Sequence, residues 1–121
     1  MLNVTTYFQI ADNTGATSAM CIRVLKKKKE HAFLGDIIIT AIKSAKANRK
    51  IKKGEIRTAV IVRQKKWLKR KTGLNIKCKS NALVFVNKQL NPIGSRIKGP
   101  IFQELRKKKL LKILAMAAIT I

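Results

Sequence analysis

The chain has 121 residues, the length of one typical domain, and 46% of them are hydrophobic, which excludes a disordered basic tail. Its 28 Lys and Arg residues are opposed by only 5 Asp and Glu residues, and the net charge of +23 excludes a protein that neutralises its own cations. Because such an excess repels itself in a compact state, we expect a partner that supplies negative charge. Nucleic acid is the densest common source of it.

Residues 1–90 consist mainly of short apolar runs rich in strand-forming residues, separated by turns that contain Gly, Asn or Asp. The strands that these runs predict are 7–11, 20–25, 37–42, 56–63, 75–79 and 82–86. The run 37–42 is almost continuously β-branched, which fits a strand that is buried on both faces or closed into a small barrel. Five or more short strands at this spacing favour a closed barrel, because closure removes exposed edges.

The character of the chain changes in two places. Residues 64–73 are strongly basic and lie between two predicted strands, so we expect them to project as a hairpin or loop. After a turn at 91–94, Pro100 suits the first position of a helix, and we expect short helices over about 100–107 and about 109–117. The second helix has apolar positions at helical spacing, which predicts a packing stripe more than a binding groove. These positions are Leu110, Leu111, Ile113, Leu114 and Ala117.

The predicted fold is therefore mainly β: a small five-stranded β-barrel with a projecting basic hairpin and two short C-terminal helices. We expect a single domain over 1–121, with the barrel in 1–90 and the C-terminal loop and helices in 91–121. We expect no targeting signal at the N-terminus, since a cationic region followed by a long apolar one is not visible there, and the apolar stretch 110–121 is shorter than the roughly 20 residues that span a bilayer. We expect no membrane partner.

The residues argue against catalysis. The single histidine, His31, follows a charged run and is best interpreted as solvated, and the five acids are scattered. Cys21 and Cys78 stand far apart in apolar or strand-like stretches, which favours two buried thiols over a disulfide or a metal site and makes a reducing compartment the default. We expect no enzyme activity, no catalytic residue, no metal and no cofactor.

Basic residues gather in clusters at 26–29, 46–53, 63–71 and 106–112, mostly in predicted loops from which they can reach phosphate. Arg can fork onto phosphate or base edges, so Arg49, Arg63, Arg70 and Arg96 are expected to make the best-defined contacts. The scattered aromatic residues do not form a stacking platform, which favours recognition of folded RNA by phosphate and shape. The residues predicted to contact RNA are Lys46, Arg49, Lys50, Lys52, Lys53, Arg63, Lys65, Lys66, Trp67, Lys69 and Arg70.

Trp67 is the aromatic exception, because it stands inside the basic hairpin. Either RNA or a protein partner could stack on it, and the sequence leaves both open. A free-standing single-strand RNA binder of the oligonucleotide-binding barrel type is the alternative function, although scattered aromatic residues count against it. A cationic membrane-surface protein is a third alternative, but the polar face of the C-terminal helix is too sparse to favour lying on lipid.

Several segments resemble the universal large-subunit ribosomal protein number fourteen, in its bacterial and organellar form. The similarity runs along the whole chain in order. It is carried by Ala11-Asp12-Asn13-Thr14-Gly15-Ala16, Met20-Cys21-Ile22-Arg23-Val24-Leu25, Gly35-Asp36-Ile37-Ile38, Val60-Ile61-Val62-Arg63, Asn81-Ala82, Pro92-Ile93-Gly94-Ser95-Arg96-Ile97-Lys98-Gly99-Pro100 and Glu104-Leu105-Arg106.

The resemblance implies a structural constituent of the large ribosomal subunit that binds large-subunit rRNA and forms bridges to small-subunit rRNA. It also implies contacts with neighbouring proteins, including large-subunit protein nineteen, and a ribosome-silencing factor that docks on the C-terminal region. Arg96 and Lys112 match positions suited to that docking, and Ser95 stands where Thr is usual. The residues expected at the subunit interface or at a partner are Ser95, Arg96, Lys98, Arg106, Lys109 and Lys112.

The sequence departs from the family pattern in local places. Lys26-Lys27 replaces a glycine pair, Lys79-Ser80 replaces Asp-Gly, and Cys78 stands where an aromatic residue is common. These changes affect loop geometry and not the fold. Heavy use of Lys and Ile indicates an AT-rich genome and favours the ribosome of an organelle, with mitochondrion slightly preferred over plastid and a bacterium left open.

Overall fold

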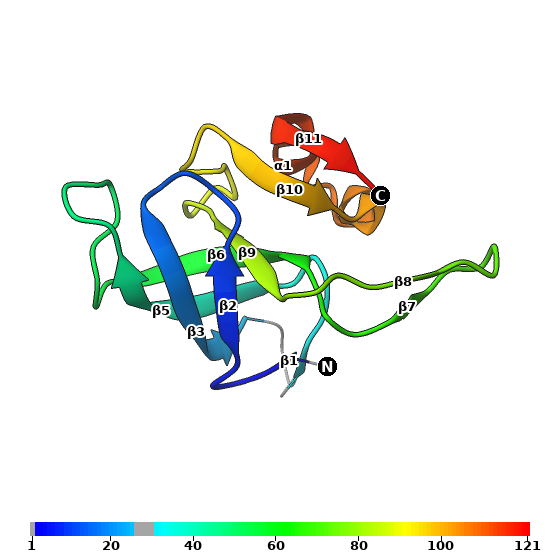
Figure 1. Cartoon of the computed structure of the whole chain (residues 1–121), viewed down its shortest axis with the longest axis horizontal. Helices are drawn as coiled ribbons and strands as arrows, with labels where there is room; N and C mark the ends of the chain where they lie inside the picture. Colours follow the sequence, from blue (N-terminus) through cyan, green and yellow to red (C-terminus); the bar gives the residue numbers. More distant parts are fainter. Residues whose placement is uncertain (1, 26–30) are drawn as a thin grey trace.

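The computed structural model describes residues 2–25 and 31–121, and at its centre is a closed five-stranded barrel (Figure 1). The barrel strands follow the order β2-β3-β5-β6-β9, and β2 and β9 are parallel whereas the other neighbours are antiparallel. The predicted barrel is confirmed. Its strands are β2 (Tyr7–Ile10), β3 (Ala16–Val24), β5 (Ile37–Ala45), β6 (Ile56–Arg63) and β9 (Ala82–Phe85).

Two apolar clusters hold the chain together, one inside the barrel and one outside it. On β6 and β9, alternate residues enter the two clusters: Ile61 and Leu83 face the barrel interior, whereas Val60 and Val84 belong to the outer cluster. The outer cluster also contains Ile101, Leu105 and Ile113 from the C-terminal segment. The continuous apolar runs on β6 and β9 are therefore buried on both faces. On β5, by contrast, buried and half-buried residues alternate.

The basic segment forms the predicted hairpin. Its arms are β7 (Leu68–Lys69) and β8 (Asn75–Ile76), which pair antiparallel and project away from the barrel (Figure 1). The strand predicted over 75–79 was too long. Only Asn75 and Ile76 are in strand conformation, and they belong to the hairpin and not to the barrel. Their alternation arises because one hairpin face packs toward the barrel core, where Ile76 and Cys78 contact the inner cluster.

The C-terminal segment lies across the outer face of β6 and β9. It contains β10 (Ile97–Ile101), a short 3-10 helix η1 (Gln103–Lys108), the helix α1 (Leu111–Met116) and β11 (Ala117–Thr120). The two helices are confirmed, but the bounds predicted for them were wrong. The first begins at Gln103, because Pro100 lies in β10 and pairs with Ile119 of β11 in a parallel ladder.

The second helix ends at Met116, because the chain turns extended at Ala117 to run beside β10. Leu110, Ile113 and Leu114 are buried, which confirms the packing stripe, although Leu111 is exposed. At the other end of the chain, β1 (Leu2–Asn3) pairs with β4 (His31–Ala32). Among the described residues, none of the helices is long and apolar enough to cross a membrane.

Candidate nucleic-acid interface

The acidic residues that the structure describes are all engaged within the protein. Asp12 is buried and accepts hydrogen bonds from the Thr14 hydroxyl at 2.6 Å and from the Phe85 amide at 3.0 Å. Burial raises the pKa of the Asp12 carboxyl, and these hydrogen bonds partly offset the effect. The three other described acids form ion pairs: Asp36 with Lys108, Glu55 with Arg57 and Glu104 with Arg70. The exposed lysines therefore receive little neutralisation from the described part of the chain.

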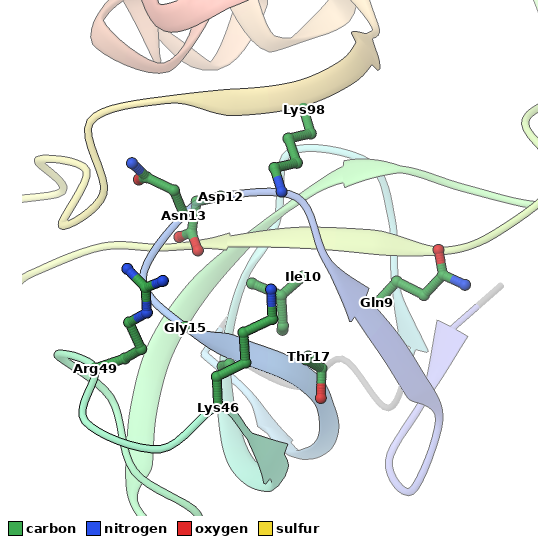
Figure 2. Close-up of a pocket in the computed structure, with 10 residues that line it drawn as sticks. Gln9, Ile10, Asp12, Asn13, Gly15, Thr17, Lys46, Arg49 and Lys98 are labelled. Atoms are coloured by element: carbon green, nitrogen blue, oxygen red, sulfur yellow. The ribbon is translucent and has the colours of Figure 1, made fainter.

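Lys46, Arg49 and Lys98 surround a concavity of about 340 Å³ beside the turn that joins β2 and β3 (Figure 2). The Lys46 amide donates to the Gly15 carbonyl at 2.8 Å, which fixes the end of β5 against the turn. The Lys98 amide donates to the Ala11 carbonyl at 2.6 Å and brings β10 to the same place. Lys46 and Arg49 were predicted to contact RNA, and Lys98 was predicted to lie at a partner surface. The fold brings all three around one concavity.

The loop that follows β5 presents three more of the predicted cations. Lys50, Lys52 and Lys53 are exposed, whereas Ile51 between them is fully buried in the barrel core and anchors the loop. The Gly54 amide donates to the Ile42 carbonyl at 2.9 Å and closes the loop. The buried Ile51 fixes the backbone that carries these lysines, and their charged side chains stay in solvent.

The hairpin presents Lys65, Lys66, Trp67 and Lys69 to solvent. The Lys77 ammonium lies over the Trp67 ring at 4.7 Å from its centroid, a cation–π contact worth about 0.5–1 kcal/mol at an exposed site. The base of the hairpin is fixed by two hydrogen bonds, from the Cys78 amide to the Gln64 carbonyl at 3.1 Å and from the Lys65 amide to the Asn81 side chain at 2.8 Å. The hairpin is thus joined to the barrel at its root.

Two arginines predicted to contact RNA have partners inside the protein. Arg63 is half-buried, and its guanidinium donates to the carbonyls of Lys98 at 2.6 Å and Pro100 at 3.2 Å. Burial lowers the pKa of the Arg63 guanidinium, which nevertheless stays charged at neutral pH. Arg70 donates to both carboxylate oxygens of Glu104, at 2.6 and 3.1 Å, and to the Ile121 carbonyl at 2.6 Å. The sequence contained no signal for these long-range pairings, and RNA contact by either residue stays a prediction.

The residues predicted at the subunit interface fall into two groups. Ser95 and Arg96 are tied to the turn between β2 and β3. In that turn the Asn13 side-chain oxygen accepts hydrogen bonds from their backbone amides, at 2.9 and 3.3 Å. Asn13 is a structural residue that sequence reasoning missed, and its place in the turn beside Gly15 was the available signal. The second group is on the C-terminal helices, where Arg106, Lys109 and Lys112 are exposed.

Lys112 donates to the Asn91 side-chain oxygen at 2.6 Å. Lys109 and Lys112 line a second concavity together with Leu90 and Leu111, and its volume is about 450 Å³.

The two cysteines do not form a disulfide. Cys21 is buried as predicted and Cys78 is half-buried, and burial raises the pKa of both thiols. His31 is half-buried and hydrogen-bonds with Asn3 through its Nδ1. The cluster at 26–29 lies outside the described residues.

Comparison with known protein families matches residues 1–121, the whole chain, to the family described as ribosomal protein L14p/L23e.

Proposed function

The chain belongs to the ribosomal protein L14p/L23e family and is a structural constituent of the large ribosomal subunit, and on this premise we propose that it binds large-subunit rRNA and helps bridge it to small-subunit rRNA. The observation that carries the proposal is the uneven placement of charge. The described acids form hydrogen bonds or ion pairs within the chain, whereas lysines of the 46–53 loop and of the hairpin are exposed around the closed barrel.

These cations would act mainly on phosphate. A Lys ammonium is a point charge that accepts any approach direction, and most phosphate contacts position RNA without reading its sequence. Lys46, Arg49 and Lys98 converge on one hollow, so a phosphate group there would meet cations from both the barrel loop and β10. Binding of this kind fixes segments of folded RNA relative to the barrel.

We assign the contacts with the small subunit and with protein neighbours to the C-terminal surface. Its exposed residues come from two sequence regions that β10 and the helices bring to the outer side of the barrel. The expected partners there are small-subunit rRNA, large-subunit protein nineteen and a ribosome-silencing factor. The residues concerned are Ser95, Arg96, Lys98, Arg106, Lys109 and Lys112.

The compartment we propose is an organelle, with mitochondrion preferred over plastid, because the Lys- and Ile-rich composition indicates an AT-rich genome. Isolation of ribosomes from purified organelles and from the rest of the cell would test this, with the chain detected by mass spectrometry in each. Its presence only in ribosomes outside the organelles would overturn the assignment.

Sedimentation tests the RNA-binding proposal directly. The tagged chain should remain with the large-subunit particle at high monovalent salt, and ultraviolet cross-linking of that particle should join it to large-subunit rRNA. In assembled ribosomes we expect additional cross-links to small-subunit rRNA. A chain that moves to the top of the gradient at high salt, and binds free RNA only at low salt, would support the single-strand binder instead.

A further inference from the structure

A hollow of about 610 Å³ opens at the root of the hairpin, and its lining combines flat apolar surface with positive charge. Trp67 lies on one side with 54% of its surface exposed, and Ile76 and the half-buried Cys78 add further apolar lining. The rim carries Lys65, Lys77 and Lys79, and none of the described residues that line the hollow is acidic. Trp67 belongs to neither apolar cluster, so its exposed indole next to three ammonium groups is not part of the core.

These features select for one kind of ligand. A flat aromatic face binds another flat π-system, and the neighbouring ammonium groups require that the ligand be anionic. An unpaired nucleotide has both properties, because its base is planar and its phosphates are negative. A base within a duplex is stacked between its neighbours and does not offer a face to the indole.

We propose that Trp67 stacks on one unpaired nucleobase of RNA while Lys65, Lys77 and Lys79 hold the phosphates on either side of it. The proposal rests on the proposed RNA-binding function and adds a nucleotide-binding site to it. It also decides between the two partners that the sequence left open for Trp67, in favour of RNA.

The geometry accommodates the base without rebuilding the hairpin. Lys77 covers one face of the indole, so a base stacks on the opposite face, or takes the place of an ammonium whose contact with the ring is weaker than base stacking. The root of the hairpin is fixed by the hydrogen bonds of Cys78 with Gln64 and of Lys65 with Asn81, and Leu68 pairs with Ile76. The platform therefore exists before the ligand arrives, which lowers the entropic cost of binding.

Trp67 is the only tryptophan of the chain, so its fluorescence reports on this site alone. The full chain is titrated with a short single-stranded RNA, with the same sequence as a duplex, and with an abasic strand of equal length and charge. We expect strong quenching by the single strand and much weaker quenching by the duplex and the abasic strand. Equal quenching by the abasic strand would overturn the proposal, because phosphate alone would then account for it.

Substitution separates stacking from charge. Trp67→Ala should weaken binding of the single strand about 5- to 140-fold, leave the salt slope unchanged and leave binding of the abasic strand unaffected. Trp67→Phe keeps a stacking face and should restore most of the affinity, which excludes misfolding as the cause. Unchanged affinity of Trp67→Ala for the single strand would refute the site.

The proposed function is judged separately by the sedimentation of Trp67→Ala. Retention of this variant on the large-subunit particle at high salt is compatible with either result for stacking. If quenching fails and the chain still sediments with the particle, only the nucleotide site is lost. Cross-linking of Trp67 to a protein instead of RNA in the assembled subunit would likewise overturn it.

Discussion

Gly15 lies in the turn between β2 and β3, in close contact with Arg49, and both residues line the concavity with Lys46 and Lys98. Its φ of +104° belongs to a backbone conformation that L side chains rarely adopt, and a Cβ atom built there would be 2.2 Å from the Cβ of Arg49. The glycine thus serves two purposes: it permits the turn, and it lets the Arg49 stem cross the backbone closely. Any side chain at this position has to move Arg49.

Gly15→Ala should therefore both destabilise the protein and weaken RNA binding. Gly54 is the matched control, because its φ is +86° but nothing lies within 4 Å of an added Cβ. Backbone strain alone costs roughly 1–2 kcal/mol, so we expect about that loss in the free energy of unfolding for Gly54→Ala and a larger loss for Gly15→Ala. Urea denaturation of the two variants measures these losses in the free energy of unfolding. Equal losses would show that contact with Arg49 has no energetic consequence.

Among the secondary-structure elements, the hairpin and the C-terminal segment are joined by Arg70, whose forked guanidinium meets Glu104 of η1 and the Ile121 carbonyl. Both side chains of this ion pair are about four-fifths buried, with 20% and 22% of their surface exposed. Burial alone would raise the pKa of Glu104, but the hydrogen bond and charge of Arg70 outweigh it, and the pKa is lowered from the ordinary value of a Glu carboxyl. The pair thus favours the ionised carboxylate in the folded state.

The sign of the pH dependence follows from that lowered pKa. A carboxyl whose pKa is lower in the folded than in the unfolded state stabilises the protein above the unfolded value and loses this effect as the pH falls. We expect Glu104→Gln to cost about 1 kcal/mol in the free energy of unfolding at pH 7, and the difference from wild type to shrink below pH about 4.5. Urea unfolding at several pH values measures it. A difference independent of pH would mean that the charge of Glu104 is unimportant.

The charge of the hairpin can be separated from this structural role. Replacing Lys65, Lys66 and Lys69 with Ser removes exposed ammonium groups and leaves Arg70 in its ion pair. Each lost phosphate contact should reduce the slope of log affinity against log salt by roughly 0.7–0.9, so binding should weaken and its salt dependence flatten. The variant with Lys50, Lys52 and Lys53 replaced is the comparison of equal charge. An unchanged slope would remove the hairpin from the RNA contacts.

The hairpin and the C-terminal segment also show where sequence reasoning reached its limit. Strands such as Ile56–Arg63 were predicted with correct bounds because β-branched runs between turn residues are a local signal. The strand β11 was not predicted, since Ala117–Thr120 becomes a strand only through its pairing with β10. The partners of Arg63 and Arg70 are likewise set by the tertiary fold, as nothing in a run of cations distinguishes a structural guanidinium from an exposed one.

For the molecule as a whole, the described lysines and arginines lie outside the apolar core. Among the described residues, the only ionisable side chains in the two apolar clusters are those of Cys21 and Cys78, whereas many of the exposed cations lie on the loop after β5, the hairpin and the C-terminal helices. Mutual repulsion among these cations acts on the folded chain as a whole, and it is relieved by screening or by a polyanion. Salt should therefore have opposite effects on the free and the RNA-bound protein.

We expect the melting temperature of the isolated chain to rise between about 10 and 300 mM monovalent salt, because the Debye length shrinks from roughly 30 Å to below 10 Å. With RNA at about 100 times the dissociation constant, binding adds roughly 2.7 kcal/mol at low salt, and added salt should reduce this gain as the complex dissociates. The two melting curves should thus converge as salt increases. Calorimetry with and without a large-subunit rRNA fragment measures both. A melting temperature of the free chain that falls with salt would mean that ion pairs such as Arg70–Glu104 outweigh the repulsion of the excess cations.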